Sequence, residues 1–170
     1  TRAYALDVGA VGKSLGLAQM LWAAFGASIA GLSVDWMGKR HGAAGRARMA
    51  AGLTILAIPS ALPLFASSAA MALAMLGTIM FVMAIYGTAM LSILSEIAPP
   101  SLRGFAVALY AFVMTMIGGS LGPVLVAGLT EQVFGDPLAI GWSMAIVGSI
   151  GFALSALLAL LAASAMAATK

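Results

Sequence analysis

The stretch Gly31-Leu-Ser-Val-Asp35-Trp-Met-Gly38-Lys39-Arg40 closes a long apolar segment with a carboxylate, a glycine and two cations. A helix that leaves hydrocarbon must satisfy its last carbonyl groups, and Gly38 can adopt the left-handed turn that does so. Lys39 and Arg40 follow at positions where the helix dipole and lipid phosphate both favour cations. We therefore expect a short charged loop between two membrane helices, on the cytoplasmic side.

Apolar residues dominate the rest of the chain. Of its 170 residues, 63% are hydrophobic and 8% are charged, whereas a soluble domain has about 45–50% and about 25%. A helix needs about 20 apolar residues to cross hydrocarbon, where open sheets cannot satisfy their backbone groups. The sequence predicts an all-α transmembrane helical bundle, a single domain over residues 1–170. Its five predicted spans are residues 8–34, 49–66, 69–97, 104–133 and 140–167.

The basic residues indicate an orientation in the membrane. With five spans, one side receives six basic residues: Lys39, Arg40, Arg46, Arg48, Arg103 and Lys170. The other side receives Arg2 and Lys13 only, and cytoplasmic loops carry the excess of cations. We expect a multi-pass protein of the inner (plasma) membrane with a cytoplasmic C-terminus. Lipid head groups explain these cations better than nucleic acid does, so membrane lipid is the expected partner.

Three segments resemble the major facilitator superfamily of secondary transporters, in its C-terminal half. Gly31, Asp35, Gly38, Lys39 and Arg40 fall on that family's loop pattern G-x-x-x-D-[RK]-x-G-[RK]-[RK], from which Trp36 departs. Glu96-Ile-Ala-Pro-Pro-Ser-Leu-Arg103-Gly104 resembles the family's link E-x-x-P-x-x-x-R-G. Residues 118–128 resemble the glycine-proline pattern of the eleventh helix in Spinster-like members.

This resemblance implies that the five spans are the eighth to twelfth helices of a twelve-helix transporter. The N-terminal half of the same longer chain is then a partner, and Thr1 is expected to be a cut end. The implied function is secondary active transport of a small organic solute, amphiphilic or lipid-like, by alternating access around a midplane site. The first, third and fourth spans would line the cavity, while the second and fifth would face lipid. The present chain is not expected to transport alone.

Four polar side chains inside the predicted spans are candidates for the substrate cavity. The amide of Gln19 must find partners in hydrocarbon and can both donate and accept. Tyr86 and Tyr110 lie at depths suited to a cavity wall, and Lys13 is a cation inside a predicted helix. Each has a structural alternative: an interhelical hydrogen bond for Gln19, packing for the tyrosines, and snorkelling to the surface for Lys13.

Glycine and proline positions suggest close packing and a bend. Small residues recur four apart at Gly12 and Gly16, Ala27 and Gly31, and Gly118 and Gly122, a spacing that favours close helix packing. Gly118, Gly119, Gly122 and Pro123 together predict a kink or hinge, because proline removes a backbone donor in mid-span. A static kink filled by a neighbouring helix is the alternative to a moving gate.

Charged pairs near the loops are interpreted as conformational rather than substrate-binding. Asp35 and Arg40 are interpreted in this way, because a carboxylate at the end of one helix can bind a neighbouring helix N-terminus or an arginine in one state and release it in another. Glu96 and Arg103 are expected to form a second cytoplasmic clamp. The alternative for both pairs is a set of surface charges that determine topology and contribute little energy.

Other classes of function have less support. The chain has no cysteine and lacks the motifs of zinc, serine and phosphate-loop enzymes, so we expect no catalytic residue, metal or cofactor. His41 is expected to be a solvated loop residue. A non-transporting helical fragment, acting as a structural or regulatory partner of another membrane protein, is the remaining alternative.

Overall fold

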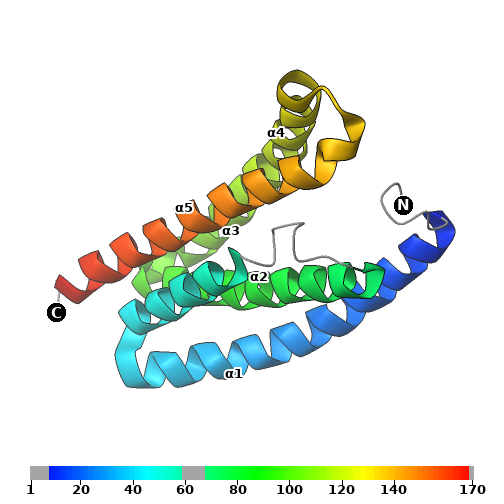
Figure 1. Ribbon diagram of the computed structural model, residues 1–170. Helices are drawn as coiled ribbons and strands as arrows, with labels where there is room; N and C mark the ends of the chain where they lie inside the picture. Colours follow the sequence, from blue (N-terminus) through cyan, green and yellow to red (C-terminus); the bar gives the residue numbers. More distant parts are fainter. Residues whose placement is uncertain (1–7, 59–67, 169–170) are drawn as a thin grey trace.

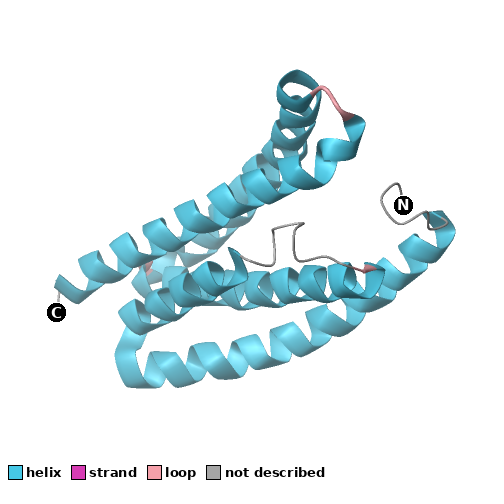
Figure 2. Cartoon of the chain, in the orientation of Figure 1, coloured by secondary structure: helices cyan, strands magenta, loops and turns pink. Residues whose placement is uncertain are grey.

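The computed structural model describes residues 8–58 and 68–168, which are almost entirely helical, with no strand among them (Figures 1 and 2). The α-helices are α1 (Val8–Ala57), α2 (Ala69–Ile97), α3 (Arg103–Val113), the short α4 (Gly122–Gly128) and α5 (Ile140–Ala168). Short 3-10 turns are η3 (Pro100–Leu102) and η6 (Pro137–Ala139), and π-helical segments are η4 (Met114–Leu121) and η5 (Leu129–Phe134). The all-α prediction is confirmed.

Helix α1 is broken at Gly42, where the backbone has φ 63° and ψ −159°. The first arm, residues 8–41, and the second arm, residues 43–57, fold back on each other around this break (Figure 1). The predicted left-handed turn at Gly38 is therefore wrong, since Gly38 lies inside the first arm. Gly42 is the residue that takes positive φ, a conformation that side chains with a Cβ rarely adopt. Lys39 and Arg40 therefore lie on the last helical turn of the first arm and not in a loop.

Four helices among the described residues are long and apolar enough to cross a membrane. They are Gln19–Ala57, Ala70–Ile97, Pro100–Phe134 and Ile140–Ala168. The first of these contains residues 19–41 of the first arm and the whole second arm, and hence parts of the first and second predicted spans. Residues 59–66 of the second predicted span lie outside the described residues, so the structure supports four spanning helices and leaves the fifth a prediction.

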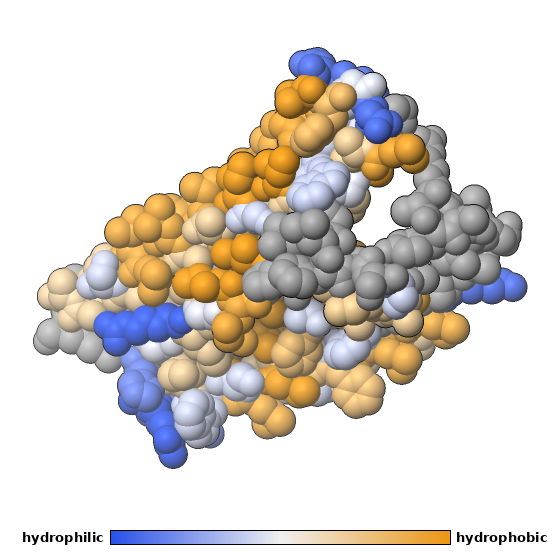
Figure 3. All heavy atoms as spheres, viewed as in Figure 1, coloured by the Kyte–Doolittle hydropathy of each residue, from blue (hydrophilic) through white to orange (hydrophobic). Residues whose placement is uncertain are grey.

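The surface has the character of a membrane protein. Apolar residues cover the flank of the bundle, and hydrophilic residues gather at its ends (Figure 3). Large apolar side chains are widely exposed, for example Leu32 at 74%, Phe105 at 67% and Leu158 at 62%. Water-soluble monomers rarely expose apolar surface on this scale, whereas lipid tails accept it without cost.

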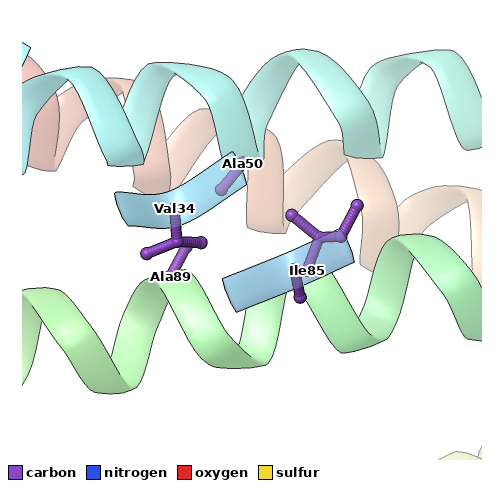
Figure 4. Packing of buried hydrophobic residues seen from close by; sticks show 5 residues of the cluster. Val34, Ala50, Ile85 and Ala89 are labelled. Carbon is purple, nitrogen blue, oxygen red and sulfur yellow. The ribbon is translucent and has the colours of Figure 1, made fainter. Parts of the chain in front are cut away.

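The second arm of α1 forms the centre of the bundle. Its residues Ala47, Ala50, Ala51, Thr54 and Ala57 are all buried, between α2 on one side and α5 on the other. Val34, Ala50, Ile85 and Ala89 come together from the two arms and α2 (Figure 4). Toward α5, the contacts of the second arm are made with Ala156, Ala159 and Ala163. We call these alanines of the second arm and α5 the alanine seam.

The closest helix contacts involve other glycines than the predicted pairs. At Gly31, Gly118 and Gly122, a Cβ would meet no described atom within 4 Å. Gly26 instead packs against Ala84 of α2, 3.2 Å from the position of a Cβ, and Gly77 of α2 lies directly under the Trp22 indole. The spacing of small residues predicted tight packing correctly but not its location, because spacing alone does not say which face of a helix meets its neighbour.

Candidate functional site

The basic end of the bundle is the end that carries Lys39, Arg40, Arg46, Arg48 and Arg103. It contains the break of α1 and the link from α2 to α3, which lie at the same end of the molecule (Figure 1). The described chain begins at the opposite end and α5 finishes at the basic end. The structure therefore groups the described cations as the alternation of spans predicted, with Lys13 at the other end.

Arg46 is the hub of the basic end. It extends from the second arm, forms an ion pair with the Glu96 carboxylate near the C-terminus of α2, and donates from Nε to the Val34 carbonyl at 3.3 Å. Its side chain is 15% exposed, whereas that of Glu96 is 50% exposed. Gly38 makes this position possible, because a Cβ there would overlap the guanidinium. One side chain thus joins the first arm, the second arm and α2.

The expected clamp between Glu96 and Arg103 is not formed. Arg103 follows the Pro99 and Pro100 turn, and its Nε donates back to the Ala98 carbonyl at 3.3 Å, which leaves Glu96 to Arg46. Sequence reasoning placed Arg46 among the loop cations and missed this role. The available signal was its spacing, because Arg46 precedes the buried Ala50 by four residues and so lies on the inner face of the second arm.

The remaining members of the predicted switch motif are exposed at the end of the first arm. Within the described residues, the Asp35 carboxylate and the Lys39 ammonium make no hydrogen bond or ion pair. Arg40 lies over the Trp36 ring, with its guanidinium carbon 4.6 Å from the ring centroid. Trp36 occupies the position where the family pattern has a cation, and it stacks on the cation that follows. The conformational role of Asp35 and Arg40 stays a prediction.

Two of the predicted cavity residues come together inside the bundle. Tyr86 of α2 packs against Ala51 of the second arm and against Ala156 and Ala159 of α5, and Tyr110 of α3 lies near it. The Tyr110 hydroxyl oxygen is buried and has no hydrogen-bond partner among the described residues, and the same holds for the Ser149 hydroxyl. A buried hydroxyl without a partner is costly, so these two hydroxyls, one on α3 and one on α5, are unused hydrogen-bonding groups.

Gln19 and Lys13 lie apart from the two tyrosines. Both are exposed on the first arm, and neither has a hydrogen-bond partner in the part of the chain that the structure describes. Helix α1 has no contact with α3, which carries Tyr110. The structure thus brings together Tyr86 and Tyr110 but not the four candidates as one set.

The predicted hinge coincides with irregular helix. Gly118 and Gly119 lie in the π-helical η4, and Gly122 and Pro123 begin α4, which is followed by the second π-helical segment η5. Proline has no backbone N–H, so one α-helical hydrogen bond is missing at Pro123. A π turn shifts the neighbouring hydrogen bonds by one residue and so accommodates the missing bond. Such segments occur often at functional sites, and here they flank a pocket.

This pocket, which we call the hairpin pocket, lies between α4 and α5 at the end of the bundle opposite the basic end. Its volume is about 840 Å3, and Glu131 is the one charged side chain among its described lining residues. The residues that line it are Gly122, Pro123, Val126, Ala127, Thr130, Glu131, Gly135, Ile140 and Met144. At its edge the Thr130 hydroxyl lies 2.8 Å from the Ser143 hydroxyl of α5 and 2.7 Å from the Val126 carbonyl. Both hydroxyl side chains are buried, so this contact joins the two walls.

The rod formed by α3, η4, α4 and η5, residues 103–134, is poorly covered. No residue from 103 to 129 is buried, and Phe105, Phe112 and Leu125 are each more than half exposed. The rod meets α2 through α3, and it meets α5 through α4 and η5. Burial therefore falls on the second arm and α5, which were expected to face lipid, rather than on this rod, which was expected to line a cavity.

Comparison of this chain with protein-family models, with curated proteins and with solved structures finds no match. The likeness to the major facilitator superfamily thus depends on the motif residues themselves.

Proposed function

We propose that this chain is part of a secondary active transporter that moves a small organic solute, amphiphilic or lipid-like, across a membrane by alternating access. The observation that carries the proposal is the rod of residues 103–134, which is exposed along its length and lies beside the hairpin pocket. Two π-helical segments, η4 and η5, interrupt its α-helix. Transporter sites are commonly built from interrupted membrane helices, because the interruption frees backbone groups and permits bending next to the cavity. A simple anchoring helix has no need of such an interruption.

The interior tyrosines support the same proposal. Among the described residues Tyr110 has a buried hydroxyl with no partner, near Tyr86, in a bundle that otherwise offers few polar groups. A solute with one hydrogen-bonding group and a large apolar part would match a surface of this composition. In this proposal Tyr110 contacts the polar end of the solute while the exposed apolar face of the rod contacts its hydrophobic part.

The rest of the transporter would come from the same longer chain. In this proposal the five spans are helices eight to twelve of a major facilitator fold, the basic end is cytoplasmic, and the N-terminal half covers the exposed rod. The hub at Arg46 then holds the two arms of α1 and α2 as one rigid unit, against which the rod can move.

The test is transport by the full natural protein in proteoliposomes. Counterflow of radiolabelled amphiphilic anions, cations and neutral solutes should exceed that of protein-free vesicles for at least one class. Tyr110→Phe should reduce flux of that solute while leaving the folded fraction unchanged, because it removes the free hydroxyl and keeps the ring. Flux equal to that of empty vesicles across all classes would remove the proposal.

Site access can be tested separately, because the chain contains no cysteine and a single introduced thiol is unique within it. Ala127→Cys places a thiol in the hairpin pocket, and Leu157→Cys places one on the exposed flank of α5 as the matched control. A transported solute should slow maleimide labelling at position 127 and not at position 157. Equal slowing at both positions would indicate a general effect of the solute on the membrane.

The uncovered rod also favours a second candidate function. A helix whose apolar face is left uncovered by the other described residues is equally suited to bind another membrane protein, as a structural or regulatory subunit would. Co-purification of a different membrane protein in fixed stoichiometry, without solute flux, would favour this function over transport.

A further inference from the structure

We infer that the bend of α1 at the basic end is a binding site for the head group of an anionic phospholipid. The site is a second pocket, of about 380 Å3, which we call the bend pocket. Met37 and His41 line it from the first arm, and Gly45, Arg48 and Met49 line it from the second. This inference depends only on the chain lying in a membrane and is independent of the transport proposal.

The polar side of the bend pocket is cationic and uncompensated. Arg48 is exposed, and among the described residues neither Arg48 nor His41 makes a hydrogen bond or ion pair. Lys39 and Arg40 lie within two residues of His41 and add to the local positive charge. Of the described acids near this bend, Glu96 is already paired with Arg46, which leaves Asp35 on the preceding turn. The balance favours an anion, and a guanidinium can hold a phosphate with two parallel hydrogen bonds.

The other side of the bend pocket is apolar. Met37 and Met49 are flexible, unbranched side chains that can fit the first methylene groups of an acyl chain. Trp36, 51% exposed and stacked under Arg40, lies one residue before Met37. Tryptophan is enriched at the level of lipid head groups because its ring is both apolar and able to donate a hydrogen bond. Cations on one wall and apolar groups on the other match the boundary between a phosphate and its lipid tails.

The bend pocket depends on a glycine as well as on its charges. A Cβ at Gly45 would overlap the Cβ of His41, so the two arms can approach at this point only because residue 45 lacks a side chain. The break at Gly42 turns the second arm back along the first (Figure 1), so that residues of both arms line one pocket. A free phosphate would find the cations but would leave the methionine wall unused, and this is why the lipid is the occupant that we propose.

The experiment measures lipid retained by the full chain in detergent, by native mass spectrometry. Phosphatidylglycerol and phosphatidylethanolamine with the same acyl chains are compared, and glycerol phosphate is the soluble competitor. We expect phosphatidylglycerol to be retained in preference, and Arg48→Gln to weaken that retention about fivefold, the effect of one basic residue near an anionic head group. Arg48→Lys should keep most of the retention because it keeps the charge.

Arg103→Gln is the matched control, since it removes one cation from the same end of the bundle on α3, which has no contact with α1. It should change retention less than twofold. Gly45→Ala, which alters no charge, should also weaken retention, with circular dichroism used to verify that the helices remain folded. Equal losses in Arg48→Gln and Arg103→Gln, equal retention of the two lipids, or full displacement by glycerol phosphate would each overturn the inference.

Discussion

Replacing Arg46 with glutamine tests the interpretation of the basic end most directly. The substitution removes the ion pair with Glu96 and the charged hydrogen bond to the Val34 carbonyl, while keeping most of the side-chain length. It should loosen the first arm, the second arm and α2 from one another at the same time. We expect the loss of stability to exceed that of any other single charge removal at this end.

The magnitude follows from the exposure of the two partners. Glu96 is half exposed, so water compensates much of its lost partner, and the pair itself contributes about 0.2–1 kcal/mol. The Val34 carbonyl loses a bond from a guanidinium that is 15% exposed, and bonds to charged donors are worth about 1.5–3 kcal/mol before water replaces part of them. Together these give a destabilisation of about 2 kcal/mol for Arg46→Gln and about 0.5 kcal/mol for Glu96→Gln.

The assay is the apparent free energy of unfolding in mild detergent, followed by circular dichroism. A double-mutant cycle with Arg46→Gln and Glu96→Gln should give a coupling energy of about 0.5–1 kcal/mol. High salt should lower this coupling, because the exposed carboxylate is screened. Arg103→Gln is the control and should cost less than about 0.5 kcal/mol. The reasoning is refuted if the coupling is zero, or if Arg103→Gln costs as much as Arg46→Gln.

Three further substitutions have defined expectations, each measured as a change in apparent melting temperature. Gly42→Ala should destabilise by about 1–3 kcal/mol, because φ 63° with ψ −159° is a conformation almost confined to glycine. Gly52→Ala is its control and should be neutral or stabilising by up to about 1 kcal/mol, since Gly52 is helical with open space around it; a loss there equal to that at Gly42 would refute the argument. Gly77→Ala should destabilise because the new Cβ meets the Trp22 indole, and Trp22→Ala should suppress this effect if that contact is its cause. Thr130→Val should cost about 0.6–1.7 kcal/mol through the lost interhelical hydrogen bond, and an unchanged melting temperature would show that the bond contributes nothing.

Much of the architecture was predictable because every backbone N–H and C=O group in hydrocarbon must be hydrogen-bonded within the protein. Long apolar stretches had to be helices, and the three longest of the predicted spans fall in α2, in the rod and in α5. The cations had to lie outside hydrocarbon, and all the described ones except Lys13 gather at the basic end. These predictions need only the composition and length of each segment, and they do not require knowing which faces of neighbouring helices are in contact.

What could not be predicted depends on contacts between distant residues. The motif suggested a turn at Gly38, yet the first arm continues to the break at Gly42. Gly38 instead leaves room for the Arg46 guanidinium, which a Cβ at residue 38 would overlap. Similarly, the sequence offers Arg46 and Arg103 as partners for Glu96. Glu96 pairs with Arg46 because the second arm runs back beside the end of α2. The π-helical form of η4 was also beyond the glycine and proline pattern, which indicates a bend without specifying how its hydrogen bonds are shifted.

The alanine seam has a mechanical consequence. Packing an alanine costs no side-chain conformational entropy. Its side chain is also too short to interdigitate with a neighbouring helix, so the second arm and α5 meet closely along smooth surfaces. Two smooth helices can slip along their common axis with few steric barriers, unlike helices that interlock large side chains. Their register must then be held by larger side chains, and Phe152 of α5 supplies one where it packs with Ala57 of the second arm and Val82 of α2. Removing the Phe152 ring would free a sliding motion while the helices stay in contact throughout.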